Sequence, residues 1–75
     1  MLEFKFTRLS EPQSIFSDNL KYIKEKMIES FYSGAACYQR IIDHDKKVVY
    51  TMIKGLKDKY EPDLSDYKEI VILDD

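Results

Sequence analysis

The stretch CYQRIIDHDKKVVYTMI, residues 37–53, decides the fold of this chain. It contains two apolar runs rich in β-branched and aromatic residues, separated by the polar residues Asp43–Lys47. If the whole stretch were helical, those polar residues would take up about one and a half turns and would break the apolar stripe at its centre. In a β-hairpin the same residues form the loop, and hairpin loops of this length are common.

A hairpin also gives the two apolar runs a shared face. Ile42 would pair with Val48, and β-branched side chains lose rotamer freedom in helices but pack well on a pleated sheet. We therefore favour a hairpin with strands at residues 36–42 and 48–54. A helix over residues 35–60 stays open as the alternative.

The segments before the hairpin predict a strand and a helix. Apolar and polar residues alternate through residues 2–8, as they do in a half-buried strand. Residues 11–32 predict a long amphipathic helix, because apolar side chains recur every three or four positions at Phe16, Leu20, Ile23, Met27 and Phe31. Ser10–Gln13 has the form of a capping box, and Gly34 is a suitable helix end.

The last apolar run, residues 67–73, predicts a strand that is covered on both faces. Together these elements define one α+β domain over residues 1–75, with a small antiparallel sheet and one long helix. In the alternative fold, two helices at residues 11–32 and 35–60 pack on a two-stranded sheet. One helix covers only one face of the four-stranded sheet, so we expect a homodimer or a target protein to cover the other.

Composition removes most kinds of catalytic and metal site. The chain of 75 residues has one cysteine, Cys37, and one histidine, His44, which excludes a disulfide within the chain and the usual zinc ligand sets. It has two glycines and no phosphate-binding or nucleophile motif. The only cluster that resembles a catalytic one is Asp43-His44-Asp45, which we interpret as a polar turn. We expect a protein that is not an enzyme and holds no cofactor or metal.

The sequence also bears on cellular location. No apolar run has the length of a signal-peptide core or of a membrane span. A single thiol fits a reducing compartment. We therefore expect a cytoplasmic protein with no membrane partner.

Charge and tyrosine content favour protein binding. Residues 1–57 carry ten basic and seven acidic side chains, whereas residues 58–75 carry two basic and seven acidic ones. The C-terminal segment could therefore meet a basic surface. The chain also has six tyrosines, a residue type that anchors many interfaces. The predicted partner-binding residues are Tyr60, Glu61, Asp63, Asp66, Tyr67, Asp74 and Asp75.

These features suggest a small non-enzymatic protein-binding module. One hypothesis is a phage-type inhibitor or modulator of a larger cytoplasmic host protein that acts in replication or transcription, such as a polymerase or sliding clamp. The alternative is a nucleic-acid-binding protein that uses lysines on the predicted helix and at the hairpin tip: Lys21, Lys24, Lys46 and Lys47. Against this alternative, Glu25, Glu29 and the acidic C-terminal segment would repel phosphate.

Overall fold

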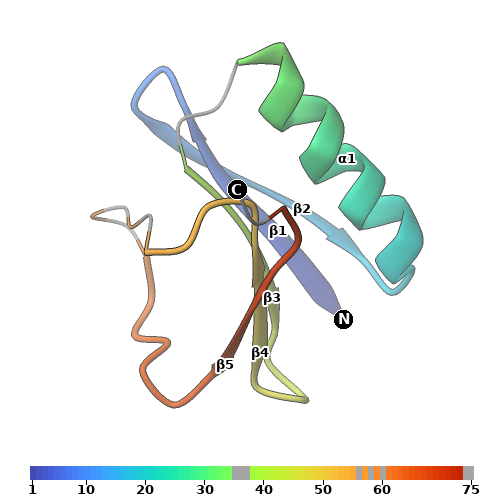
Figure 1. Cartoon of the computed structure of the whole chain (residues 1–75), viewed down its shortest axis with the longest axis vertical. Helices are drawn as coiled ribbons and strands as arrows, with labels where there is room; N and C mark the ends of the chain where they lie inside the picture. The colour runs from blue at the N-terminus through green and yellow to red at the C-terminus, as the bar shows by residue number, and fades with distance from the viewer. Residues whose placement is uncertain (35–37, 56, 58, 60, 74–75) are drawn as a thin grey trace.

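The structure, a computed structural model, describes residues 1–34, 38–55, 57, 59 and 61–73. Within these residues the elements follow the order β1 (Leu2–Arg8), β2 (Glu11–Ser17), α1 (Leu20–Ser33), β3 (Tyr38–Asp43), β4 (Val48–Thr51) and β5 (Lys68–Val71) (Figure 1). The strands form one sheet in the order β2-β1-β3-β4-β5, and α1 packs against it. The predicted α+β fold, a small sheet with one helix, is confirmed.

The sheet is mixed, which corrects the prediction of a four-stranded antiparallel sheet. β1 is antiparallel to β2 and β3, and β3 is antiparallel to β4, but β5 runs parallel to β4. Parallel neighbours need a connection long enough to carry the chain back along the sheet. The predicted strand 67–73 is found as the shorter β5 beside β4. It lies at the edge of the sheet and its residues are exposed or half-buried, so the prediction that both of its faces are covered is wrong.

The predicted helix 11–32 is wrong in its first part, which forms the additional strand β2. Leu9 and Ser10 have positive φ angles of +52° and +65°, and they make a two-residue turn between β1 and β2. Positive φ at both positions is the pattern of a type I′ hairpin turn, and here it forms without the usual asparagine or glycine. The predicted capping box, Ser10–Gln13, is therefore part of a turn followed by an edge strand.

α1 begins after an asparagine cap and ends at a glycine. The Oδ1 atom of Asn19 accepts a hydrogen bond from the Tyr22 amide at 3.1 Å, which satisfies one free N–H group of the first turn. Gly34 ends the helix as predicted: its φ is +69°, and its N–H donates to the Phe31 carbonyl at 3.2 Å. No helix in the described part of the chain is long and apolar enough to span a membrane.

A hairpin is present as predicted, but its strands differ from the predicted 36–42 and 48–54. β3 extends to Asp43, β4 ends at Thr51, and residues 36 and 37 lie outside the described residues. The alternative of a helix at residues 35–60 is wrong for the part of that range that the structure describes. The two strands pair one residue away from the predicted register, so Ile42 lies opposite Val49 rather than Val48. Cys37 lies outside the described residues.

Asp43 explains the shift in register. Its Oδ1 atom accepts hydrogen bonds from the amides of Asp45 and Lys46 at 3.1 and 3.0 Å, so this carboxylate organises the turn from the end of β3. The loop is therefore His44–Lys47, one residue shorter than predicted. Lys47 closes the loop with a φ of +53°.

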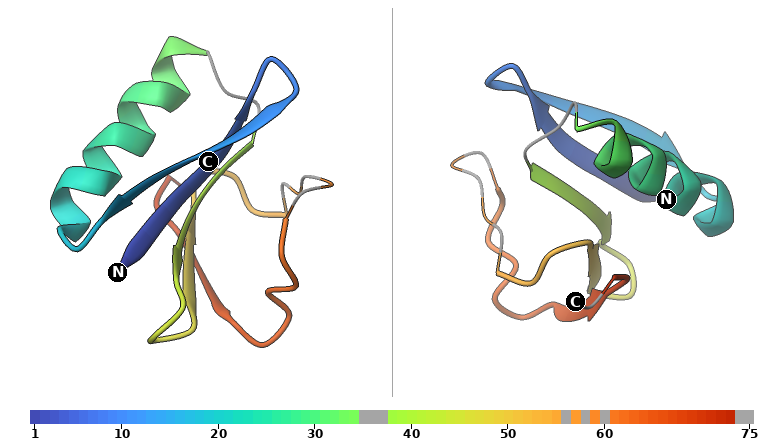
Figure 2. Two further views of the ribbon diagram at one scale, coloured as in Figure 1. Left: turned by 180° about the vertical axis from the view of Figure 1, so that it is seen from behind. Right: turned by 45° about the horizontal axis from the view of Figure 1, so that its top comes forward.

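α1 covers one face of the sheet. Ile23 and Met27 of α1 are fully buried in a cluster with Phe4 of β1 and Ile41 of β3. Phe16, which the helical pattern predicts in the core, is instead 59% exposed on β2. Figure 2 shows α1 beside β1 and β2, with the connection between β4 and β5 at the other end of the sheet.

β3 is buried on both faces. Tyr38 and Ile42, which alternate with the residues that face α1, are 2% and 0% exposed. Residues 61–67 of the same chain cover this part of the sheet, where Leu64 and Val49 lie in the wall of one cavity. The expectation that a second protein must cover the second face therefore does not hold for β3 and β4.

The turn at Leu9 and Ser10 provides a test of this fold. Leu9 is 88% exposed, so replacing it removes little packing, but positive φ strains a leucine by about 1 kcal/mol. We expect the double variant Leu9→Asn, Ser10→Gly to raise the free energy of unfolding by about 1 kcal/mol in urea titrations. Leu9→Ala, which keeps the strained turn, is the control and should change it by less than about 0.5 kcal/mol. A double variant no more stable than the wild type would contradict the type I′ turn.

Candidate partner-binding site

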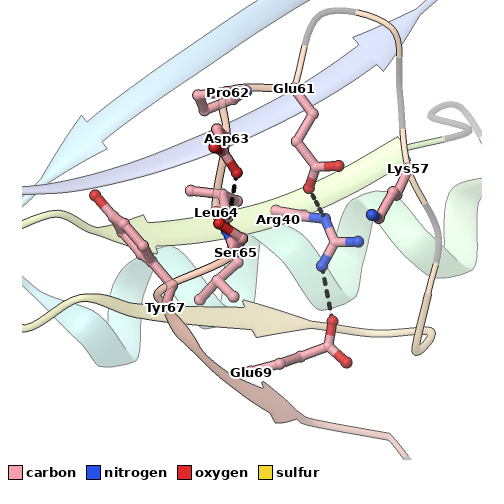
Figure 3. Close-up of a pocket in the computed structure, with 10 residues that line it drawn as sticks. Arg40, Lys57, Glu61, Pro62, Asp63, Leu64, Ser65, Tyr67 and Glu69 are labelled. Atoms are coloured by element: carbon pink, nitrogen blue, oxygen red, sulfur yellow. Dashed lines mark hydrogen bonds and ion pairs between the residues drawn. The ribbon is translucent and has the colours of Figure 1, made fainter.

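A buried arginine lies at the centre of the candidate site. Arg40 occupies a position of β3 that is 3% exposed and would usually hold an apolar residue. Its Nε atom lies 2.5 Å from Oε1 of Glu61, and its Nη1 atom donates to Oε2 of Glu69 at 3.1 Å. Figure 3 shows Arg40 between the two carboxylates.

Because Arg40 is buried, its two ion pairs are important for the stability of the fold. Moving a guanidinium out of water costs several kcal/mol unless it is paired and hydrogen-bonded. Glu61 precedes β5 and Glu69 lies in it, so the charge of one β3 residue holds two parts of the C-terminal segment against the sheet. The side chains of Glu61 and Glu69 are 10% and 29% exposed, so solvent screens these pairs less than it screens surface pairs.

Tyr38 lies beside the same charges. Its ring centroid is 5.7 Å from Cζ of Arg40. Burial, together with the negative charge of Glu61, raises the pKa of the Tyr38 hydroxyl well above its usual value, and the positive charge of Arg40 partly opposes this rise. The phenol therefore stays neutral at physiological pH and adds no charge to the site.

The C-terminal segment and the sheet form an open cavity of about 360 Å³ beside Arg40. Its lining residues are Arg40, Val49, Lys57, Glu61, Pro62, Asp63, Leu64, Ser65, Tyr67 and Glu69 (Figure 3). Two of these side chains are basic and three are acidic. The lining therefore carries a net negative charge, which attracts cationic groups.

Three of the predicted partner-binding residues line this cavity: Glu61, Asp63 and Tyr67. Asp66 does not line it, and its Oδ2 atom pairs with Nζ of Lys47 at 3.0 Å. This hydrogen bond lowers the pKa of Asp66 and raises the pKa of Lys47. The other predicted residues, Tyr60, Asp74 and Asp75, lie outside the described residues.

Local hydrogen bonds fix the rim of the cavity. The Oδ1 atom of Asp63 accepts a hydrogen bond from the Ser65 amide at 3.1 Å, as aspartates do in Asx turns. The Tyr67 hydroxyl and Nδ1 of His44 are 2.7 Å apart. These contacts fix the positions of Asp63 and Tyr67 at the rim of the cavity.

The cluster at His44 does not bring its three side chains to one point. His44 lies in a turn, as predicted, and its Nε2 atom is 3.7 Å from Oε1 of Glu3. Asp43 instead bonds the turn amides, and Asp45 is exposed beside the N-terminal amine. Within the residues that the structure describes, no group of three His, Cys, Asp or Glu side chains could hold a metal ion.

The lysines of the nucleic-acid hypothesis are divided between α1 and the β3–β4 loop. Nζ of Lys24 lies 4.9 Å from the centroid of the Tyr50 ring, and Lys47 is already paired with a carboxylate. Lys46 lines a small cavity that also contains Asp18, Asp43 and Asp45. Acidic side chains thus lie beside the two loop lysines, which weakens the attraction of these lysines for phosphate.

The sequence patterns do not single out Arg40, and they include Glu69 only among the acidic residues of the segment 58–75. One signal is present, because an arginine inside an otherwise apolar strand needs counter-charges. The sequence does not say which carboxylates supply them, since Glu61 and Glu69 lie 21 and 29 positions after Arg40.

No protein-family model matches the chain, and comparisons with curated proteins and with solved structures found no match either.

We expect Arg40→Met to lower the free energy of unfolding by about 3 kcal/mol at neutral pH, because it leaves two carboxylates without their counter-charge in a buried site. Urea titration followed by circular dichroism measures the loss. Arg8→Met, at an exposed arginine, is the matched control and should change the stability by less than about 0.5 kcal/mol.

A triple variant, Arg40→Met, Glu61→Met, Glu69→Met, separates the effect of charge on stability from the effect of side-chain packing. It removes the uncompensated carboxylates as well as the arginine, so it should recover most of the lost stability. A triple variant as unstable as Arg40→Met alone would indicate that packing of the arginine side chain, rather than its charge, holds the segment.

Proposed function

We propose that the protein is a small, non-enzymatic binding module that recognises a basic side chain on a larger cytoplasmic protein. The main support for this proposal is the cavity beside Arg40, because its lining carries a net negative charge. Glu61, Asp63 and Tyr67 lie in its wall. A lysine or arginine of the partner would enter this cavity.

The carboxylates of the cavity have capacity for a second cation. Glu61 and Glu69 each pair with Arg40 through one oxygen atom, Oε1 and Oε2 respectively. A carboxylate has two oxygens, so Oε1 of the more exposed Glu69 can accept a further charge-assisted hydrogen bond. Asp63 is exposed at the rim and adds a third negative charge. Because Arg40 already holds the two glutamates in place, binding a partner would order fewer side chains.

Tyr67 supplies the apolar part of such a contact. Its ring lies in the wall of the cavity and is half-buried, while its hydroxyl is held by His44. Tyrosines in this position can pack along the methylene groups of a lysine or arginine, and they are enriched among the residues that dominate interface energies.

Proteins that handle DNA are a partner class with the required chemistry, because they present lysines and arginines that contact phosphate. A module that occupied such residues would compete with nucleic acid, which is the action of a phage-type inhibitor of a polymerase or sliding clamp. The alternative of direct nucleic-acid binding has less support, because the loop lysines Lys46 and Lys47 lie beside aspartates.

A pull-down from the source cytosol, followed by mass spectrometry, would name the partner, and a titration against it tests the site. Asp63→Asn removes one charge but keeps the side-chain oxygen that accepts from the Ser65 amide. We expect this variant to bind about three- to tenfold more weakly and to lose part of the salt dependence. Glu25→Gln, which removes one exposed charge from α1, is the matched control and should bind as the wild type does.

Two results would count against this function. The first is equal affinity and equal salt dependence for Asp63→Asn and the wild type. The second is salt-sensitive binding of DNA by the isolated protein that is lost on changing Lys21 and Lys24, which would favour the nucleic-acid alternative.

A further inference from the structure

β2 is an edge strand with unpaired backbone groups. Among the described residues, β1 is its only neighbour in the sheet. Arg8 and Glu11 close the two-residue turn, and such a closing pair exchanges both of its backbone hydrogen bonds. Bonded and non-bonded pairs alternate along an antiparallel ladder, so the N–H and C=O groups of residues 12, 14 and 16 point away from β1.

The position of Pro12 is consistent with residue 12 facing away from β1, and it reduces the number of free N–H groups along this edge. Proline has no N–H, and it is tolerated in a sheet where the N–H would face solvent. Ser14 and Phe16 are then the β2 residues that offer both a free donor and a free acceptor.

Beyond Glu11 and Pro12, this edge lacks the protection that natural sheets usually carry. Edge strands are commonly guarded by charged side chains, above all by lysine. β2 has no charged residue from Pro12 to Ser17, whereas β5, at the other edge, contains Lys68 and Glu69. Phe16 also leaves 59% of its surface exposed. An edge of this kind favours pairing with another strand.

We propose that β2 pairs with β2 of a second copy of this chain, antiparallel, with the two-fold axis at Ile15. Ser14 then lies opposite Phe16 of the partner subunit, and Phe16 lies opposite the partner subunit's Ser14. Both pairs exchange their backbone hydrogen bonds, because these residues direct their N–H and C=O groups outwards. The two sheets become one continuous sheet with a closed two-fold interface.

The side chains favour a second copy over an unrelated strand. On the face away from α1, this register places the exposed ring of Phe16 beside a small serine, and the symmetry repeats the fit. On the α1 face, Ile15 meets Ile15 of the partner subunit. Because residues 12–17 carry no charge, two copies approach each other without repulsion at the strand.

The side of α1 that borders this edge is also incompletely covered. A cavity of about 230 Å³ lies between α1 and the β1–β2 hairpin, with Ile15 and Lys26 in its wall. Tyr22 is 44% exposed, and Nζ of Lys26 lies 5.7 Å from its ring centroid. A second copy at the β2 edge would cover this region and add buried surface to a chain of 75 residues, whose own core is thin.

The dimer goes beyond the proposed function, because it uses β2 at one edge of the sheet whereas the cavity beside Arg40 adjoins β5 at the other. Pairing at β2 therefore leaves the cavity accessible. Each dimer would present two such cavities to a partner.

Sedimentation of the full chain over a concentration series tests the pairing. We expect the wild type to reach twice the monomer mass, and Ser14→Pro to dimerise at least about tenfold more weakly, because proline removes the N–H that pairs across the axis. Ser14→Ala keeps that N–H and is the matched control, which should dimerise as the wild type does. Circular dichroism checks that each variant folds.

Phe16→Lys is an independent variant, because it brings two positive charges near the axis without altering the backbone. Tyr32→Lys, at a residue of α1 that is 71% exposed, is the matched control. We expect at least about tenfold weaker dimerisation for Phe16→Lys and less than about a twofold change for Tyr32→Lys. A wild type that is monomeric at every concentration, or a dimer that neither Ser14→Pro nor Phe16→Lys weakens, would overturn the proposal.

Discussion

Burying the charge of Arg40 is the constraint on which the C-terminal half of this structure depends. β3 is covered on both faces, so the guanidinium within it must find its counter-charges inside the protein. Glu61 and Glu69 supply them from the chain that follows β4. This requirement gives a physical reason for the C-terminal segment to fold back over the sheet.

The same interaction connects the fold with the candidate site. Glu69 lies in β5, and β5 is held beside β4 by contacts such as the Ile72 amide, which donates to the Thr51 carbonyl at 2.7 Å. Glu61 belongs to the segment that forms the cavity wall. The core under α1 is apolar and contains none of these charges. The face of the sheet under α1 is therefore stabilised by apolar packing. On the other face, ion pairs hold the C-terminal segment and also form part of a negatively charged cavity.

Local patterns in the sequence predict most of the fold and part of the site. β-Branched residues on both sides of a polar loop identify the β3–β4 hairpin, the spacing of Ile23 and Met27 identifies α1, and charge counts select the segment 58–75. The turn at Leu9–Ser10 could not be predicted from composition, because neither residue favours positive φ, and β2 therefore resembles the first part of a helix. The ion pairs of Arg40 join residues far apart in the chain, and periodicity carries no information about such contacts.

Native-state hydrogen exchange in an Arg40→Lys variant tests most directly whether this buried group holds the C-terminal segment. Lysine keeps the charge but lacks the planar fork that reaches two carboxylates. We expect faster exchange at the amides of Lys68 and Ile72, which donate to the carbonyls of Lys47 and Thr51. The Ile23 amide of α1 should exchange as it does in the wild type. Unchanged exchange at Lys68 and Ile72 would show that Arg40 does not hold the C-terminal segment.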